Sequence, residues 1–105
     1  MITKENGCNL FAYFEGEINI NSINEFGKDM DKLESEANMN IVLNLSQVSY
    51  INSLGLGTII DVYKKLKAKG RNLKIVCDSA MVREILGVVK FDKLIPIYYN
   101  DEEVI

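Results

Sequence analysis

The chain has 105 residues, a formal net charge of −3 and no histidine, and its residues are 48% hydrophobic and 26% charged. This length suits one domain with a modest core, and the acidic balance gives no electrostatic footprint for a nucleic-acid partner. The absence of histidine excludes Ser–His and Cys–His catalytic pairs and imidazole metal ligands, so we expect neither an enzyme nor a metal or cofactor site.

The first residues predict a β-hairpin. Residues 9–15 are rich in aromatic side chains and predict a strand, paired with a short strand over residues 3–6 across an Asn6-Gly7 turn. The segment Gly16-Glu17-Ile18-Asn19 is expected to end the strand pattern.

A helix is expected to follow, beginning at Ser22. Glu25 lies three residues later and would complete a capping box with Ser22. The expected buried stripe of this helix has helical spacing and consists of Ile23, Phe26, Met30 and Leu33. The polar residues 38–40 end the helix, and the apolar residues 41–45 predict a buried strand.

The most informative stretch joins that strand to a second helix. It places the Ser53 hydroxyl at the start of the helix, where unpaired N–H groups and the helix dipole create a partial positive charge. A serine at this position either caps the helix or carries a phosphate at low electrostatic cost. Gly55-Leu56-Gly57 is half of a glycine-rich nucleotide fingerprint, but the third glycine is missing, which favours a packing role.

The second helix is expected over residues 53–69, with Gly70 as its C-terminal stop. Its apolar face is predicted to contain Leu56, Ile59, Ile60, Tyr63 and Leu66. At 100° per residue, Leu54 points away from this face, toward the polar side that carries Thr58. Leu54 is therefore expected to face solvent beside Ser53, either as an ordinary exposed leucine or as a partner contact.

The end of the second helix is basic, with Lys64, Lys65, Lys67, Lys69 and Arg71 close together. These residues form either a solvated helix end whose charge complements the dipole or a docking patch for an acidic partner. Asp61 and Asp78 are isolated carboxylates without the spacing of metal ligands.

The remaining residues continue the alternation of strands and helices. Residues 73–77 predict a strand, and Asp78 or Ser79 is expected to cap a third helix. The apolar face of that helix is predicted to be Val82, Ile85, Leu86 and Val89. Residues 94–98 predict a last short strand, placed at a sheet edge by Pro96, and residues 101–103 begin one more helical turn.

The two cysteines, Cys8 and Cys77, lie far apart in the sequence and both have strand-like surroundings. We expect both to be reduced and packed. The N-terminus lacks the apolar run of a signal peptide, and no segment approaches a membrane-spanning length. We therefore expect a cytoplasmic protein without a membrane partner.

Two motifs resemble the signature of the STAS family, which includes anti-sigma factor antagonists and related domains of sulfate transporters. One is Leu-x-x-Val-Ser-Tyr-Ile-Asn-Ser-Leu-Gly-Leu-Gly, within residues 41–57, and the other is Gly16-Glu17-Ile18-Asn19, similar to the family's Gly-Glu-[Leu/Ile]-Asp turn. The order of strands and helices fits this family over essentially the whole chain. The resemblance implies a single α/β domain of the STAS type over residues 1–105, with a central, mostly parallel mixed β-sheet and packed α-helices.

The resemblance also implies a function in bacterial transcription control. In this family an unphosphorylated antagonist binds an anti-sigma factor that is a serine kinase, and so releases a sigma factor. The kinase phosphorylates the motif serine, here Ser53, and a PP2C-type phosphatase restores the active form. The expected partner-binding residues are Asn19, Asn52, Ser53, Leu54, Gly55 and Thr58, in a chain that is monomeric when free. The alternative is a STAS-type interaction module of a transporter or signalling scaffold without phospho-switching.

The chain departs from the family pattern at two positions. Asn52 stands before the serine, and Asn19 stands at the end of the Gly-Glu turn, where the family usually has acidic residues. The fold should tolerate both neutral replacements. Phosphorylation should be more sensitive, because a missing carboxylate alters how the kinase orients or deprotonates the acceptor hydroxyl.

Overall fold

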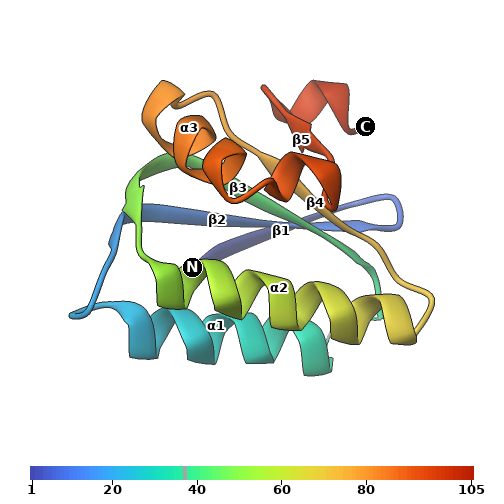
Figure 1. The fold of residues 1–105 in the computed structure, drawn as a ribbon. Helices are drawn as coiled ribbons and strands as arrows, with labels where there is room; N and C mark the ends of the chain where they lie inside the picture. Colours follow the sequence, from blue (N-terminus) through green and yellow to red (C-terminus); the bar gives the residue numbers. More distant parts are fainter. Residues whose placement is uncertain (37) are drawn as a thin grey trace.

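Five strands form one mixed β-sheet in the computed structural model, which describes residues 1–36 and 38–105. The strands, in their order across the sheet, are β1 (Ile2–Asn6), β2 (Asn9–Ile18), β3 (Asn40–Ile51), β4 (Leu73–Val76) and β5 (Ile97–Tyr98). β1 runs antiparallel to β2, and every other neighbouring pair is parallel (Figure 1). This architecture confirms the predicted single α/β domain with a mostly parallel sheet.

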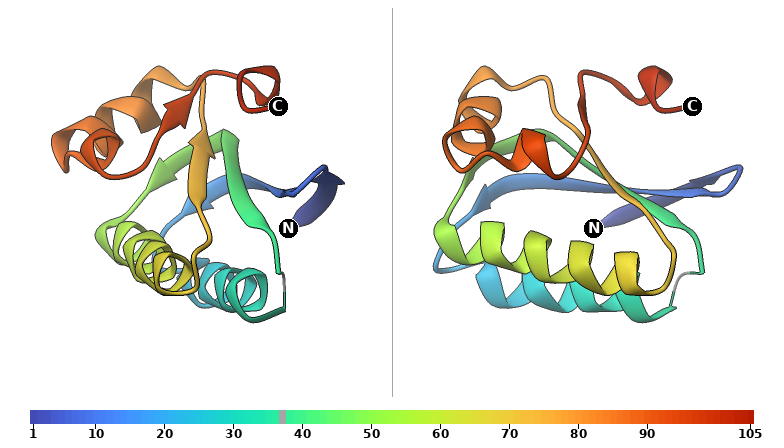
Figure 2. Two further views of the ribbon diagram at one scale, coloured as in Figure 1. Left: turned by 90° about the vertical axis from the view of Figure 1, so that its right-hand side faces the viewer. Right: turned by 45° about the vertical axis from the view of Figure 1, so that its right-hand side comes forward.

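Three helices in the described part of the chain cover the sheet. They are α1 (Ile23–Glu36), α2 (Ser53–Ala68) and α3 (Ala80–Val88), and two short 3-10 turns follow, η1 (Phe91–Lys93) and η2 (Asp101–Glu103). α1 and α2 lie side by side, and α3 lies apart from them, near the end of β3 (Figures 1 and 2). None of the helices in residues 1–36 and 38–105 is long and apolar enough to cross a membrane.

All three helices contribute to one core. Met30 of α1, Ile59 of α2 and Leu86 of α3 are fully buried in the same hydrophobic cluster as Leu43 of β3. A smaller cluster consists of Phe11, Val42 and Val76, with Tyr13, Tyr98 and Val104 packed against it. The alternation of side chains along each strand separates the two clusters, because successive residues point to opposite faces of a sheet.

The C-terminal turn is tied to the central strands through Asp101. Its carboxylate accepts hydrogen bonds from the Tyr13 hydroxyl at 2.7 Å and from the Asn44 side-chain amide at 2.8 Å. Burial, followed by the hydrogen bond and charge of Asp101, raises the pKa of Tyr13 to about 12. Tyr13 therefore stays a neutral hydrogen-bond donor at any physiological pH.

β2 and β3 are longer than the sequence predicts. β2 continues through Gly16 to Ile18, and β3 continues to Ile51, so the Gly-Glu segment does not end the strand. The parallel pairing of β2 and β3 continues beyond two register shifts, one between Tyr13 and Glu15 and one between Gly16 and Glu17. At each shift β3 contains one residue more than β2. Such bulges hide the simple alternation that identifies a strand in a sequence.

The predicted capping box at the start of α1 is wrong. The Ser22 hydroxyl bonds backward, donating to the Glu17 carbonyl at 2.6 Å and accepting from the Asn19 N–H at 3.0 Å. Asn19 adds an Asx turn, since its side-chain oxygen accepts from the Asn21 N–H at 2.9 Å. These bonds hold the turn between β2 and α1 and engage the Ser22 hydroxyl that the capping box would require.

Smaller differences lie near the C-terminus and at the first cysteine. Ser79, rather than Asp78, caps α3, and Val89 is 47% exposed instead of lying on the buried face. The last strand is limited to Ile97–Tyr98, at the predicted sheet edge. Cys77 is buried, which raises the pKa of its thiol, whereas Cys8 is exposed in the turn after β1 and is not packed.

Two of the five basic residues near the end of α2 make tertiary contacts. Lys69 forms an ion pair with Glu34 at 2.8 Å, and this bond lowers the pKa of the Glu34 carboxyl. Arg71 donates to the carbonyls of Met39 at 2.8 Å and Glu34 at 3.1 Å. The end of α2 is thereby attached to the end of α1, while Lys64, Lys65 and Lys67 remain exposed.

Candidate functional site

The turn after β2 and the start of α2 meet at one edge of the sheet. The last paired residues of β2 and β3 are Ile18 and Ile51, so Asn19 and Asn52 leave the sheet side by side. The Asn52 N–H donates to the Ile18 carbonyl at 2.9 Å and holds the two segments together. The structure thus brings together the two segments that contain the predicted partner-binding residues (Figure 1).

Asn52 caps α2, and the capping interpretation of Ser53 is therefore wrong. The Asn52 side chain accepts from the Gly55 N–H at 2.8 Å, and its carbonyl accepts from the Leu56 N–H at 3.0 Å. Its extended backbone (φ −87°, ψ 175°) and its amide oxygen are both typical of an N-cap. Ser53 becomes the first helical residue, and its exposed side chain is left out of the cap.

The electrostatic surroundings of Ser53 suit a negative group. The N–H groups of Ser53 and Leu54 belong to the first turn, where a helix has no partners of its own for its amides. The first turn of α2 contains no acidic side chain that would compensate the positive end of the dipole. A phosphate on Ser53 would lie next to these amides without disturbing the cap made by Asn52.

Gly55 brings α2 close to the strand ends. A Cβ at this position would lie 2.8 Å from Cγ2 of Ile18 and 2.8 Å from Cγ1 of Ile51, both shorter than real contacts. Gly55 is buried, so it supports the site by packing and fixes the position of the first turn of α2. Thr58 is half-buried, and its hydroxyl donates to the Leu54 carbonyl at 2.9 Å.

The close approach at Gly55 also sets the rotation of α2. Its buried residues are Gly55, Ile59, Val62 and Leu66. Leu56, Ile60 and Tyr63 are only partly buried at the border of the core, although the sequence predicts them on the central face. A glycine contributes nothing to an apolar pattern, which explains why the sequence pattern misplaces the face.

Two large apolar side chains are exposed on the two segments that meet here. Leu54 is 63% exposed, which confirms that it lies on the solvent side of α2, and Ile20 in the turn after β2 is 80% exposed. Ile20 is a candidate contact that the sequence reasoning missed. Its signal is an isoleucine inside the polar turn Asn19-Ile20-Asn21-Ser22, where no core pattern requires an apolar residue.

Comparisons with known proteins identify the family and the fold. The STAS domain family matches residues 1–104. A candidate anti-sigma factor antagonist of Thermotoga neapolitana is 29% identical over 83 residues, covering 78% of this chain and 74% of that protein. The anti-sigma F factor antagonist of Paenibacillus polymyxa is 27% identical over 93 residues, covering 88% and 80% of the two chains. The crystal structure of a candidate anti-sigma factor antagonist from Thermotoga maritima superposes with a TM-score of 0.86 at 27% identity, covering 98% of this chain and 89% of that one.

Proposed function

The chain belongs to the STAS domain family, and on that premise we propose that it is an anti-sigma factor antagonist that binds an anti-sigma factor serine kinase, releases a sigma factor, and is switched off by phosphorylation of Ser53. A PP2C-type phosphatase would remove the phosphate. The observation that carries this proposal is the exposed Ser53 at the first position of α2, freed from capping by Asn52. Relatives named as anti-sigma factor antagonists support the antagonist part of this proposal.

The surface around Ser53 supports a role in binding. Leu54 of α2 and Ile20 of the turn after β2 both expose apolar side chains. An interface typically has apolar contacts at its centre and polar groups at its rim. Here Asn52 and Thr58 supply polar neighbours, and the turn containing Ile20 is hydrogen-bonded through Asn19 and Ser22.

Phosphorylation would act on the interface and not on the fold. A phosphate adds about −2 charge at pH 7 together with tightly held water. The dipole of α2 stabilises this charge within the domain. An apolar partner surface packed on Leu54 would instead bury the charge without a counter-charge, which is unfavourable. The switch therefore needs no conformational change in the antagonist.

The test is phosphorylation by the anti-sigma factor kinase of the same genome, with ATP, followed by peptide mass spectrometry. We expect one modified residue, Ser53, and no modification of Ser53→Ala. Ser35→Ala is the matched control, because it removes another exposed helical serine. A kinase that binds the chain but modifies another residue, or none, would exclude the switching role and leave the interaction module without phospho-switching.

Asn52→Asp is expected to raise the rate of Ser53 phosphorylation while leaving the melting temperature nearly unchanged. Aspartate and asparagine cap helices about equally well, so the bond to the Gly55 N–H is kept. The new carboxylate would lie beside the acceptor residue, where it can orient or deprotonate the hydroxyl. Initial rates with radiolabelled ATP measure the effect, and an unchanged or lower rate would show that this kinase does not use the acid.

Leu54→Ala is expected to weaken kinase binding about tenfold, since the loss of a central apolar contact typically costs about 1–2 kcal/mol. Its side chain is 63% exposed, so the melting temperature should barely change. Val88→Ala in α3 is the control, because Val88 is 77% exposed and lies on a different element. Calorimetric titration measures both variants, and equal affinities for the two would remove Leu54 from the interface.

A further inference from the structure

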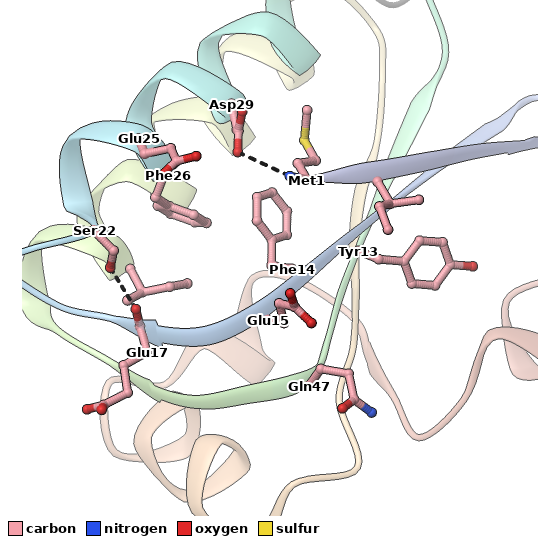
Figure 3. Close-up of a pocket in the computed structure, with 12 residues that line it drawn as sticks. Met1, Tyr13, Phe14, Glu15, Glu17, Ser22, Glu25, Phe26, Asp29 and Gln47 are labelled. Carbon is pink, nitrogen blue, oxygen red and sulfur yellow. Dashed lines mark hydrogen bonds and ion pairs between the residues drawn. The ribbon is translucent and has the colours of Figure 1, made fainter.

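A groove of about 390 Å³ lies between the second half of β2 and the first half of α1. Its floor is apolar and includes Phe14, Ile18 and Phe26, each of which is at most 8% exposed. The rings of Phe14 and Phe26 pack edge to face, with their centroids 5.1 Å apart (Figure 3). None of residues 52–58 lines the groove, although Ile18 and Ser22, which do line it, flank the turn that contains Asn19 and Ile20.

The rim of the groove is strongly acidic. Glu15 and Glu17 come from β2, while Glu25 and Asp29 come from consecutive turns of α1 (Figure 3). Among the described residues that line the groove, no lysine or arginine side chain balances these four carboxylates. The α-amino nitrogen of Met1 lies 3.8 Å from the Asp29 carboxylate.

One wall of the groove is a strand edge. β1 pairs with β2 only as far as Ile2 opposite Tyr13, so within residues 1–36 and 38–105 the stretch from Phe14 to Ile18 has a strand neighbour on the β3 side alone. The Glu17 carbonyl on the open side accepts from the Ser22 hydroxyl at 2.6 Å. Open strand edges beside apolar pockets are surfaces on which extended peptides dock.

The carboxylates do not converge on one point: Glu25 and Asp29 lie on α1, whereas the Glu17 side chain on β2 points away from α1 (Figure 3). No three acidic or thiol side chains in the described part of the chain lie close enough together to hold a metal ion. This arrangement suits several positive charges along an extended chain better than one compact cation. The apolar floor between the walls suits an uncharged side chain placed among them.

From this charge complementarity we propose that the groove docks an extended basic segment of a partner polypeptide. An apolar side chain of that segment lies against Phe14 and Phe26, and its flanking arginine or lysine side chains pair with the carboxylates of both walls. The proposal goes beyond the role of Ser53 and does not depend on it.

The experiment is an NMR titration of the ¹⁵N-labelled chain with three probes. The first is the acetylated, amidated peptide Arg-Leu-Arg-Val-Arg, the second is its counterpart Glu-Leu-Glu-Val-Glu, and the third is agmatine, a small dication with one guanidinium and one ammonium group. We expect the basic peptide to shift the amides of residues 14–18 and 25–29, and to bind at least tenfold more tightly than either other probe. Raising the salt concentration should weaken this binding.

Two double variants test which carboxylates bind the basic peptide. Glu25→Gln combined with Asp29→Asn should weaken binding of the basic peptide about fivefold, because each partly exposed ion pair contributes modestly. The control, Glu84→Gln combined with Asp92→Asn, changes the net charge equally on exposed residues of α3 and η1 and should leave the affinity unchanged. Equal losses in the two double variants would mean that only net charge matters and would overturn the proposal.

Three other results would also overturn it. Shifts confined to residues 52–58 would place basic peptides at the other surface. Agmatine binding as tight as that of the peptide would assign the groove to a small cation. Shifts of residues 14–18 that grow with protein concentration alone would assign it to a second copy of this chain. Ser53→Ala should bind the peptide normally, which keeps this test independent of the phosphorylation switch.

Discussion

Gly55→Ala is expected to lower the free energy of unfolding by about 1–3 kcal/mol, the usual cost of adding a methyl group to a well-packed site. The new Cβ would lie 2.8 Å from a γ carbon of Ile18 and 2.8 Å from one of Ile51, and both side chains are buried. These atoms are attached close to the backbone of the two strand ends, so they cannot move away as the tip of a long side chain would. Thermal and urea denaturation measure the change.

Gly57→Ala is the matched control two residues along the same helix. A Cβ at Gly57 meets no atom within 4 Å. Alanine should therefore raise the stability by about 0.5–1 kcal/mol through its higher helix propensity. The two variants should shift the melting temperature in opposite directions, with about 4–8 °C for each kcal/mol in a domain of this size. If Gly55→Ala were as stable as Gly57→Ala, the close contact between α2 and the strand ends would be contradicted.

Ser53→Asp is expected to weaken binding to the anti-sigma factor kinase about a hundredfold. A charge buried against an apolar partner surface without a counter-charge costs several kcal/mol, and about 2.7 kcal/mol corresponds to a hundredfold change. The melting temperature should stay the same or rise slightly, because a carboxylate in the first turn of α2 is favoured by the helix dipole. The combination of an intact fold and lost binding is the signature of a switch that acts at the interface.

Two controls make this result specific. Ser53→Asn has nearly the same shape as Ser53→Asp but no charge, so it should bind much more tightly than Ser53→Asp. Ser35→Asp adds the same charge at an exposed serine in α1 and should bind like the unmodified chain. Calorimetric titration of the four proteins separates shape from charge and local charge from net charge. Equal affinity of Ser53→Asp and Ser53→Asn would show that a negative charge at this position does not control binding.

The order of the elements and the position of the motif serine can be predicted from the sequence alone. Local rules suffice for both, because helical spacing, strand alternation and turn residues act over a few neighbours. The direction of Leu54 could also be predicted, since 100° per residue places it opposite most apolar residues of α2 regardless of what α2 packs against. For Ile20, the sequence shows only an apolar residue inside a polar turn, with no helical or strand spacing that would assign it to the core.

The details of both surfaces depend on contacts that the sequence pattern does not reveal. Strands β2 and β3 continue to Ile18 and Ile51 because they pair with each other beyond the two register shifts. These shifts interrupt the alternation of buried and exposed side chains by which a strand is recognised in a sequence. Their common end places Asn52 as the cap, frees Ser53 and buries Gly55 against two isoleucines. The acidic groove likewise exists only where β2 continues past β1 and faces α1. These features depend on contacts between residues far apart in the chain, which periodicity within one segment does not encode.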